Sequence, residues 1–159
     1  MKIFVLRDSV FVHAPIERCF ALSTSVDVVA CDLRMHPVGG RTRGLVQAGD
    51  LISWRGWQLG LPQFHVSCIP PEAFHAPVRF RDKMVAGRFR YFEHDHFFES
   101  HEDGVWLRDE VRFALPFGLA GSLVGACVLA PHIRGLMRRR FQRLKRLAEG
   151  SGWRSFLSD

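Results

Sequence analysis

The stretch FEHDHFFE, residues 92–99, places two histidines and three acidic residues among phenylalanines. In an extended strand alternate side chains point to opposite faces, so His94 and His96 would share a face with two of the phenylalanines. Imidazoles in this setting could act as acid–base catalysts, bind a metal ion, anchor the polar end of a ligand, or form a hydrogen-bonded cluster within the core. The stretch by itself leaves all four roles open.

A carboxylate interrupts the apolar face of the next expected strand, residues 104–115. Its odd positions are apolar except for Asp109, while its even positions carry charged residues, so we expect the odd face to point inward. If the turn before this strand centres on residues 102–103, Asp109 lies directly across from His94 or His96, depending on the register. Two imidazoles and one carboxylate would then share an interior patch.

Asp82 interrupts the apolar face of residues 73–83 in the same way. A buried carboxylate without a partner is strongly disfavoured, so it either takes up a proton or finds a partner. We therefore expect Asp82 and Asp109 to form one or two hydrogen-bonded pairs with the two histidines inside the fold. Such a network could be purely structural, or it could orient a ligand.

The spacing does not predict a metal site or a cofactor. A His-x-His pair on a strand occurs at metal sites, and a carboxylate could supply a third ligand. The neighbouring inward positions are phenylalanines, however, and the spacing assures no further ligand. The glycine-rich segment GGRTRG, residues 39–44, lacks a flanking strand and the Lys-Ser/Thr pair of a phosphate-binding loop.

The elements that must position these residues follow from the hydrophobic periodicity. Residues 3–13 read as a strand, the segment 15–23 as a short helix beginning at its proline, and 24–34 as one or two further helical turns. We expect the polar, glycine-rich residues 36–44 to form a loop. The period-two pattern that follows predicts five strands, at 46–58, 63–70, 73–83, 88–100 and 104–115.

After Pro116 the period becomes helical and predicts a long C-terminal helix, which Pro131 should kink or divide. The expected fold is therefore α+β: a curved antiparallel sheet of six to seven strands wrapped around the long helix, with two short helices after the first strand. A chain of 159 residues suits a single domain, 1–159.

The composition narrows the class of protein. Fourteen phenylalanines accompany one tyrosine, so many rings without a polar group must line a core or an apolar cavity. The four cysteines form no CxxC pair, which excludes zinc-ribbon and thioredoxin-like proteins. Charges interrupt the first twelve residues, and no uninterrupted apolar run approaches a membrane span, so we expect a cytoplasmic protein without stable membrane insertion.

The net charge of +6 is concentrated between Arg134 and Arg146, where seven basic residues and no acid occur. One interpretation is the solvated back of the helix. The other is a peripheral contact with acidic lipid headgroups, nucleic acid or a partner. No recognised nucleic-acid-binding motif accompanies the basic residues, so nucleic acid is not expected. The residues that could make such a contact are Arg138, Arg139, Arg140 and Arg143.

Two longer strings carry a family resemblance. FRDKMVAGRFRYFEHDHFFE, followed by GVWLRDEVRFALPFG, resembles the SRPBCC or START-like helix-grip superfamily, and most of all its bacterial polyketide cyclase/dehydrase and lipid-transport branch. In that branch F-x-D-x-M-x-x-G-x-F precedes an aromatic residue, H-x-H, D-x-V and P-x-G. The matching positions are Phe80, Asp82, Met84, Gly87, Phe89, Phe92, His94, His96, Asp109, Val111, Pro116 and Gly118. Arg88 departs from the small residue or proline common there.

The resemblance implies a deep apolar cavity between the sheet and the C-terminal helix. Members bind lipids, sterols, polyketides or other hydrophobic molecules, and a minority catalyse cyclisation or dehydration. The first expectation is thus a protein that binds a hydrophobic small molecule without a cofactor. The expected ligand-binding residues are Trp54, Phe80, Asp82, Phe92, His94, His96, Phe98, Asp109, Val111 and Phe113.

Two alternatives remain open. One is a cofactor-free cyclase or dehydratase that uses His94, His96 and Asp109 as an acid–base cluster. The other is an interaction module that docks through the basic helix. The sequence does not name the ligand or the oligomeric state.

Overall fold

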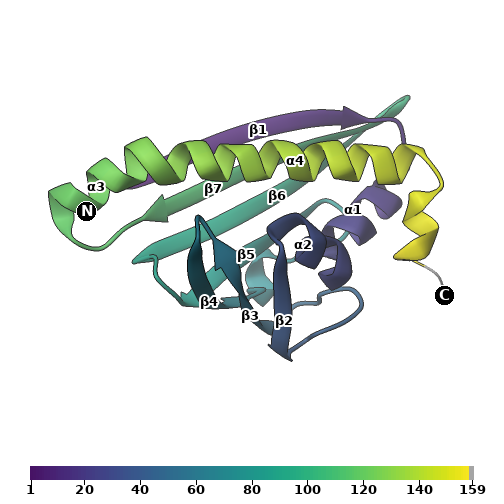
Figure 1. The fold of residues 1–159 in the computed structure, drawn as a ribbon. Coiled ribbons are helices and arrows are strands. Elements are labelled where there is room, and N and C mark those ends of the chain that lie inside the picture. Colours follow the sequence, from purple (N-terminus) through teal and green to yellow (C-terminus); the bar gives the residue numbers. More distant parts are fainter. Residues whose placement is uncertain (158–159) are drawn as a thin grey trace.

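A computed structural model describes residues 1–157 as a seven-stranded antiparallel sheet curled around one long helix (Figure 1). The strands lie in the order β1-β7-β6-β5-β4-β3-β2. The elements are β1 (Phe4–Val12), α1 (Ile16–Thr24), α2 (Val26–Leu33), β2 (Met35–Gly40), β3 (Leu51–Gln58), β4 (Leu61–Cys68), β5 (Arg79–Ala86), β6 (Tyr91–His101), β7 (Gly104–Ala114), α3 (Gly118–Val124), a π-helical turn (Gly125–Leu129) and α4 (Ala130–Glu149). The α+β arrangement expected from the sequence is confirmed.

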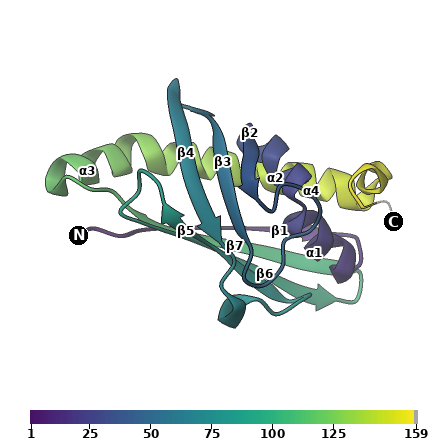
Figure 2. The same ribbon diagram turned by 90° about the horizontal axis from the view of Figure 1, so that it is seen from below.

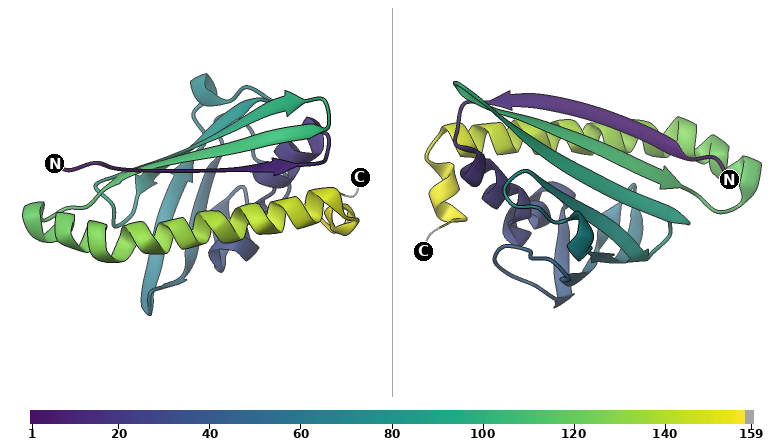
Figure 3. Two further views of the ribbon diagram at one scale, coloured as in Figure 1. Left: turned by 90° about the horizontal axis from the view of Figure 1, so that it is seen from above. Right: turned by 180° about the vertical axis from the view of Figure 1, so that it is seen from behind.

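The long helix lies across one face of the sheet, as the views from above and from behind show (Figure 3). It packs on β1, and its C-terminal half contacts α1 and α2. The β3–β4 hairpin is set at a steep angle to the long strands β6 and β7 (Figure 2). The sheet is therefore strongly curved, and its concave face and the helix enclose an interior.

Residues 36–44 were expected as a loop, but residues 36–40 belong to strand β2, so the prediction was wrong for them and holds for 41–44. Met35–Gly40 pairs with β3, and a bulge between Pro37 and Gly39 shifts the register. Gly40 has a φ of 70°, and a Cβ there would lie 1.9 Å from the carbonyl oxygen of Leu51. The glycine thus allows two backbones to approach closely, which the sequence pattern could not distinguish from a loop signal.

Strand β5 starts at Arg79, later than the predicted residue 73. A 3₁₀ turn at Pro71–Ala73 and a cis peptide bond between Ala76 and Pro77 occupy the segment before it. Proline lacks the N–H that a strand interior requires, which explains why this segment is not paired as a strand.

The C-terminal helix runs from Gly118 to Glu149 and remains helical through Pro131. The π-helical turn ends at Leu129, two residues before this proline, and the N–H of Ala130 donates to the carbonyl oxygen of Gly125. A π turn changes the hydrogen-bond ladder locally, so the irregularity next to Pro131 is absorbed there. The predicted kink or division takes the form of this π turn.

An 18-residue stretch of this helix has a mean hydropathy of 1.4, so by length and composition it could span a membrane. Only 22% of the stretch is buried in the fold. Glycines, a serine and Pro131 interrupt its apolar residues, which is why no uninterrupted run is visible in the sequence. The same helix continues into residues packed on the sheet, so composition alone does not establish a span.

Two clusters of buried apolar residues fill the interior. The larger cluster joins α1, α2 and the C-terminal half of α4 to the sheet, and it contains Trp54, Leu107 and Phe141. The smaller cluster contains Val111, Phe113, Ile133 and Met137, among others. Buried polar side chains of β6, β7 and α4 lie between the two clusters.

Candidate ligand-binding site

The pairing of β5, β6 and β7 settles which inward groups face each other. His96 lies opposite Asp109, and Asp82 lies opposite His94. Of the two registers that the sequence allowed for Asp109, the structure has the one that pairs it with His96. All four side chains lie in the interior because their strands alternate inward and outward residues.

Asp109 is the centre of a buried hydrogen-bonded cluster. Its carboxylate accepts from His96 Nδ1 and His94 Nε2, both at 3.0 Å, and from Arg140 Nη1 at 2.6 Å. Burial by itself would raise the pKa of Asp109, but Arg140, His96 and His94 together hold the pKa well below its usual range. The carboxylate is therefore ionised, and each histidine donates a ring N–H to it.

His96 is held as a neutral ring. Burial and the neighbouring His94 lower the pKa of His96 to about 3. Its ring stacks on Phe80 with 4.2 Å between the centroids, and the His94 ring lies 3.9 Å away. His94 is the more exposed of the two, with 17% of its side chain accessible. His94 is thus the better placed of the two to meet a ligand.

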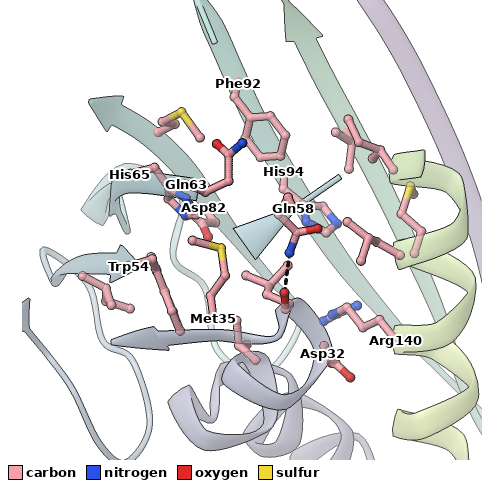
Figure 4. A pocket seen from close by; sticks show the side chains of 18 of the residues that line it. Asp32, Met35, Trp54, Gln58, Gln63, His65, Asp82, Phe92, His94 and Arg140 are labelled. Atoms are coloured by element: carbon pink, nitrogen blue, oxygen red, sulfur yellow. Dashed lines mark hydrogen bonds between the residues drawn. The ribbon is translucent and has the colours of Figure 1, made fainter. Parts of the chain in front are cut away.

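Asp82 is not a member of the Asp109 cluster. Protein atoms surround it, yet part of its surface faces the cavity beside His94 (Figure 4). Burial raises the pKa of Asp82 to about 6, against the opposing effects of His94 and the Ser67 hydroxyl. The expected pairing of both aspartates with the histidines therefore holds for Asp109, while Asp82 remains available to a bound molecule.

The cavity has a volume of about 220 Å³ and lies between the sheet and the long helix. Aromatic and aliphatic side chains form most of its wall, with Trp54 2% exposed on β3. Polar groups also reach it, and Figure 4 shows Gln58, His65 and Arg140 among them. An apolar wall with a few polar groups is how small-molecule sites are usually built.

Most of the residues expected at the site line the cavity. Those that do are Trp54, Phe80, Asp82, Phe92, His94, His96 and Val111. Phe98 and Phe113 lie instead in the larger and smaller core clusters. Asp109 lies behind the two histidines, so it orients cavity residues without lining the cavity itself.

Arg140 corrects one of the sequence expectations. It was grouped with the arginines on the solvated back of the helix, but only 8% of it is exposed, and it pairs with Asp109. Arg143 pairs with Asp32 of α2 through a contact of 2.8 Å between its Nε and Oδ1. Of the four arginines, Arg138 and Arg139 are exposed as expected.

The sequence analysis also missed polar residues from α2, β4 and α4. Burial raises the pKa of Asp32 to about 6, against Arg140 and Arg143, and lowers the pKa of His65 to about 4. His132 Nε2 lies 2.9 Å from Gln58 Oε1, and the Gln58 amide donates to the carbonyl oxygen of Leu33. This bridge joins α4, β3 and the end of α2 at the edge of the cavity.

His94, His96 and Asp109 bring ligand atoms within 4.8 Å of one another, as a metal site would. Both carboxylate oxygens, however, already accept hydrogen bonds, and the Arg140 guanidinium lies 2.6 Å from Oδ2. A metal ion would have to displace this internal cation. The three residues therefore do not fit a metal centre.

No protein-family model and no curated protein matches the sequence. Solved structures are similar in fold. TTHA0849 from Thermus thermophilus is 17% identical with a TM-score of 0.65, over 88% of this chain and 96% of that one. The Zhui aromatase/cyclase from Streptomyces sp. R1128 is 10% identical with a TM-score of 0.67, over 95% and 99% of the two chains.

The di-domain ARO/CYC BexL from the BE-7585A biosynthetic pathway is 15% identical with a TM-score of 0.70. The match covers 93% of this chain and 50% of BexL. At these identities the comparisons establish a shared fold.

The Asp109–Arg140 pair yields a prediction about stability. Asp109→Leu leaves a buried guanidinium without its partner, so we expect the free energy of unfolding to fall by about 3–5 kcal/mol. Arg140→Leu should also destabilise, and the double variant should lose much less than the sum of the two. Urea unfolding at neutral pH measures all three. Arg139→Leu, at an exposed neighbour, is the control and should change stability by less than about 0.5 kcal/mol.

His65 yields a prediction about the stability of the fold at acidic pH. The unfolded chain protonates His65 near its ordinary pKa of 6.5, whereas the folded protein resists protonation down to about pH 4. Wild type should therefore lose stability relative to His65→Leu as the pH falls through this window, by up to about 3 kcal/mol at about 1.4 kcal/mol per pKa unit. Unfolding by urea at several pH values tests this. Phe64→Leu removes no titrating group, and its difference from wild type should not vary with pH.

Proposed function

Because the chain has the helix-grip fold of the SRPBCC superfamily, we propose that it binds a small hydrophobic molecule in the cavity between the sheet and the long helix. The observation that carries this proposal is the cavity itself, whose apolar wall is interrupted by Asp82 and His94 on one side. The apolar wall would remove the body of the ligand from water, and the two polar groups would fix its orientation.

The size of the cavity favours a compact ligand. Its volume of about 220 Å³ is smaller than the roughly 300–1,000 Å³ of typical ligand pockets. A ring system or a single short chain fits such a space better than a lipid with two acyl chains. Among the molecules that the fold suggests, we therefore favour a small aromatic or polyketide-like compound.

The polar groups favour a ligand with oxygen atoms. A carboxyl group with a pKa of about 6, as at Asp82, can accept a hydrogen bond when ionised and donate one when protonated. The Nε2–H group of His94 donates to Asp109, so the other ring nitrogen, Nδ1, can form a hydrogen bond with the ligand. A hydroxyl or carbonyl group at one end of the ligand would match this pair.

Native mass spectrometry of the purified protein, followed by extraction of bound molecules, tests the binding. We expect a hydrophobic, oxygen-containing mass, and titration of hydroxylated aromatic compounds should quench the fluorescence of Trp54. Leu136→Phe, which adds volume at the cavity wall, should weaken binding at least tenfold. Leu147→Phe, on the same helix but outside the cavity, is the matched control. Equal binding by both variants would place the ligand elsewhere.

A cofactor-free cyclase or dehydratase is the second candidate. It is favoured by the position of a carboxyl group with a raised pKa beside an imidazole in the cavity, because such a pair can supply a general acid and a general base. Two of the similar structures, Zhui and BexL, are described as aromatase/cyclases. The fold that they share with this chain supports this candidate.

Turnover of a poly-β-ketone by the purified protein tests the second candidate. If Asp82 acts as a general acid, kcat/KM should decline as the pH rises above about 6, and Asp82→Asn should lower kcat at least a hundredfold. Ligand affinity should stay within about tenfold, which is about 1.4 kcal/mol. If the rates of wild type and Asp82→Asn are the same, the cavity binds without Asp82-dependent chemistry.

A further inference from the structure

The start of the long helix is apolar on the outside. In the segment 117–128 the buried residues are Gly121 and Gly125, while large apolar side chains point to solvent. A Cβ on Gly125 would lie 2.5 Å from the Phe4 ring, so the helix rests on β1 through its smallest residue. We call the exposed side chains the apolar tip; they are Phe117, Leu119, Leu123, Val124 and Val128.

The exposure of the apolar tip is too large and contiguous to be incidental. Leu119 is 91% exposed, Phe117 84% and Leu123 66%. Single exposed apolar residues are normal on protein surfaces, but a contiguous group marks a surface that contacts something apolar. The hydropathy of this helix, 1.4 over a stretch that is 22% buried, is therefore not explained by packing within the fold.

Other exposed apolar residues lie at the same end of the molecule. Phe4 pairs with Phe113, so the N-terminal Met1 and Ile3, 74% and 48% exposed, lie beside the start of the helix. Figures 1 and 3 show the N-terminus next to α3 at one extremity.

The charges of this end have one sign. No aspartate or glutamate occurs in residues 1–7, 84–92 or 111–134, which form the start of the long helix and the strand ends beside it. The exposed cations there include Lys2, Arg88, Arg90 and Arg134. Acidic residues gather at other places, such as the turn between β6 and β7 at the opposite end of the sheet.

We propose that the apolar tip docks the protein on an anionic lipid surface, with its side chains in the interfacial layer and the surrounding cations against acidic headgroups. An apolar helical face rimmed by basic residues has the features of an interfacial membrane contact. A second copy of the chain fits less well, because a two-fold contact through this end would bring the same cations together.

The proposed contact also places the cavity next to the lipid. Arg88, in the connection between β5 and β6, lines the cavity and is exposed, so it marks an opening of the cavity toward this end. Leu129 and Ile133 line the cavity one helical turn or so beyond the apolar tip. A hydrophobic ligand dissolved in the membrane could thus reach the cavity with little exposure to water. The docking does not depend on the proposed ligand binding and can be tested without a ligand.

Vesicle co-sedimentation tests the docking. The full chain should bind vesicles of phosphatidylcholine mixed with phosphatidylglycerol at least tenfold more tightly than phosphatidylcholine vesicles, and high salt should reduce this preference. The double variant Leu119→Glu/Leu123→Glu should lose at least tenfold in binding to the mixed vesicles. Both residues are exposed, so folding should be unaffected. Val78→Glu, 49% exposed near the opposite end of β5, is the matched control and should bind like wild type.

A fluorescence measurement locates the contact. Cys127 is exposed within the same helical segment, so an environment-sensitive dye attached there, in a Cys31→Ser background, should shift to the blue on addition of mixed vesicles. Failure to bind the mixed vesicles, equal binding by Leu119→Glu/Leu123→Glu, or an unshifted dye would overturn the proposal. Light scattering that shows a wild-type dimer and a monomeric double variant would overturn it too, because the apolar tip would then be a subunit interface.

Discussion

The structure depends on an ionised carboxylate kept in the interior. Asp109 is 4% exposed and remains charged because β6 and α4 bring three donors to it. A buried charge is tolerated only when its partners are fixed in place, so this cluster constrains the elements that supply them. It fixes the register of β6 on β7 and the rotation of α4 about its own axis. It also forms a polar layer between the two apolar clusters.

The same cluster determines which groups remain free for chemistry. His96 is enclosed as a neutral ring between Phe80 and the carboxylate, while His94 reaches the cavity. Asp82, opposite His94 on the next strand, has no share in the ion pair, and burial keeps its pKa high. His94, His96 and Asp82 all point inward from neighbouring strands. Each has different partners, so each has a different role at the cavity.

The sequence predicted the inward face of β7 well, because alternation is a local property: Leu107, Asp109 and Val111 are buried, and Arg108 is exposed. Contacts between residues far apart in the sequence were harder to predict. Arg140 follows Ile133 and Met137 at helical spacing, yet its charge suggested that it faces solvent. Its partner, Asp109, is 31 residues away in the sequence, and the helical pattern does not reveal it. Strand β2 was missed because glycine and proline signal loops, and only the proximity of β3 shows otherwise. The exposure of the apolar tip could not be predicted, since apolar composition usually indicates burial.

Two groups of elements form the wall of the cavity, and only one of them carries the buried ion pair. Strands β6 and β7 and helix α4 carry the ion pair, whereas Ile52, Trp54, Gln63 and His65 on β3 and β4 line the cavity without contacting it. Substitutions on the β3–β4 hairpin can therefore reshape the binding space while the framework stays intact. This separation makes the hairpin the natural region in which to diversify residues for new ligand specificities, in evolution or in a designed library.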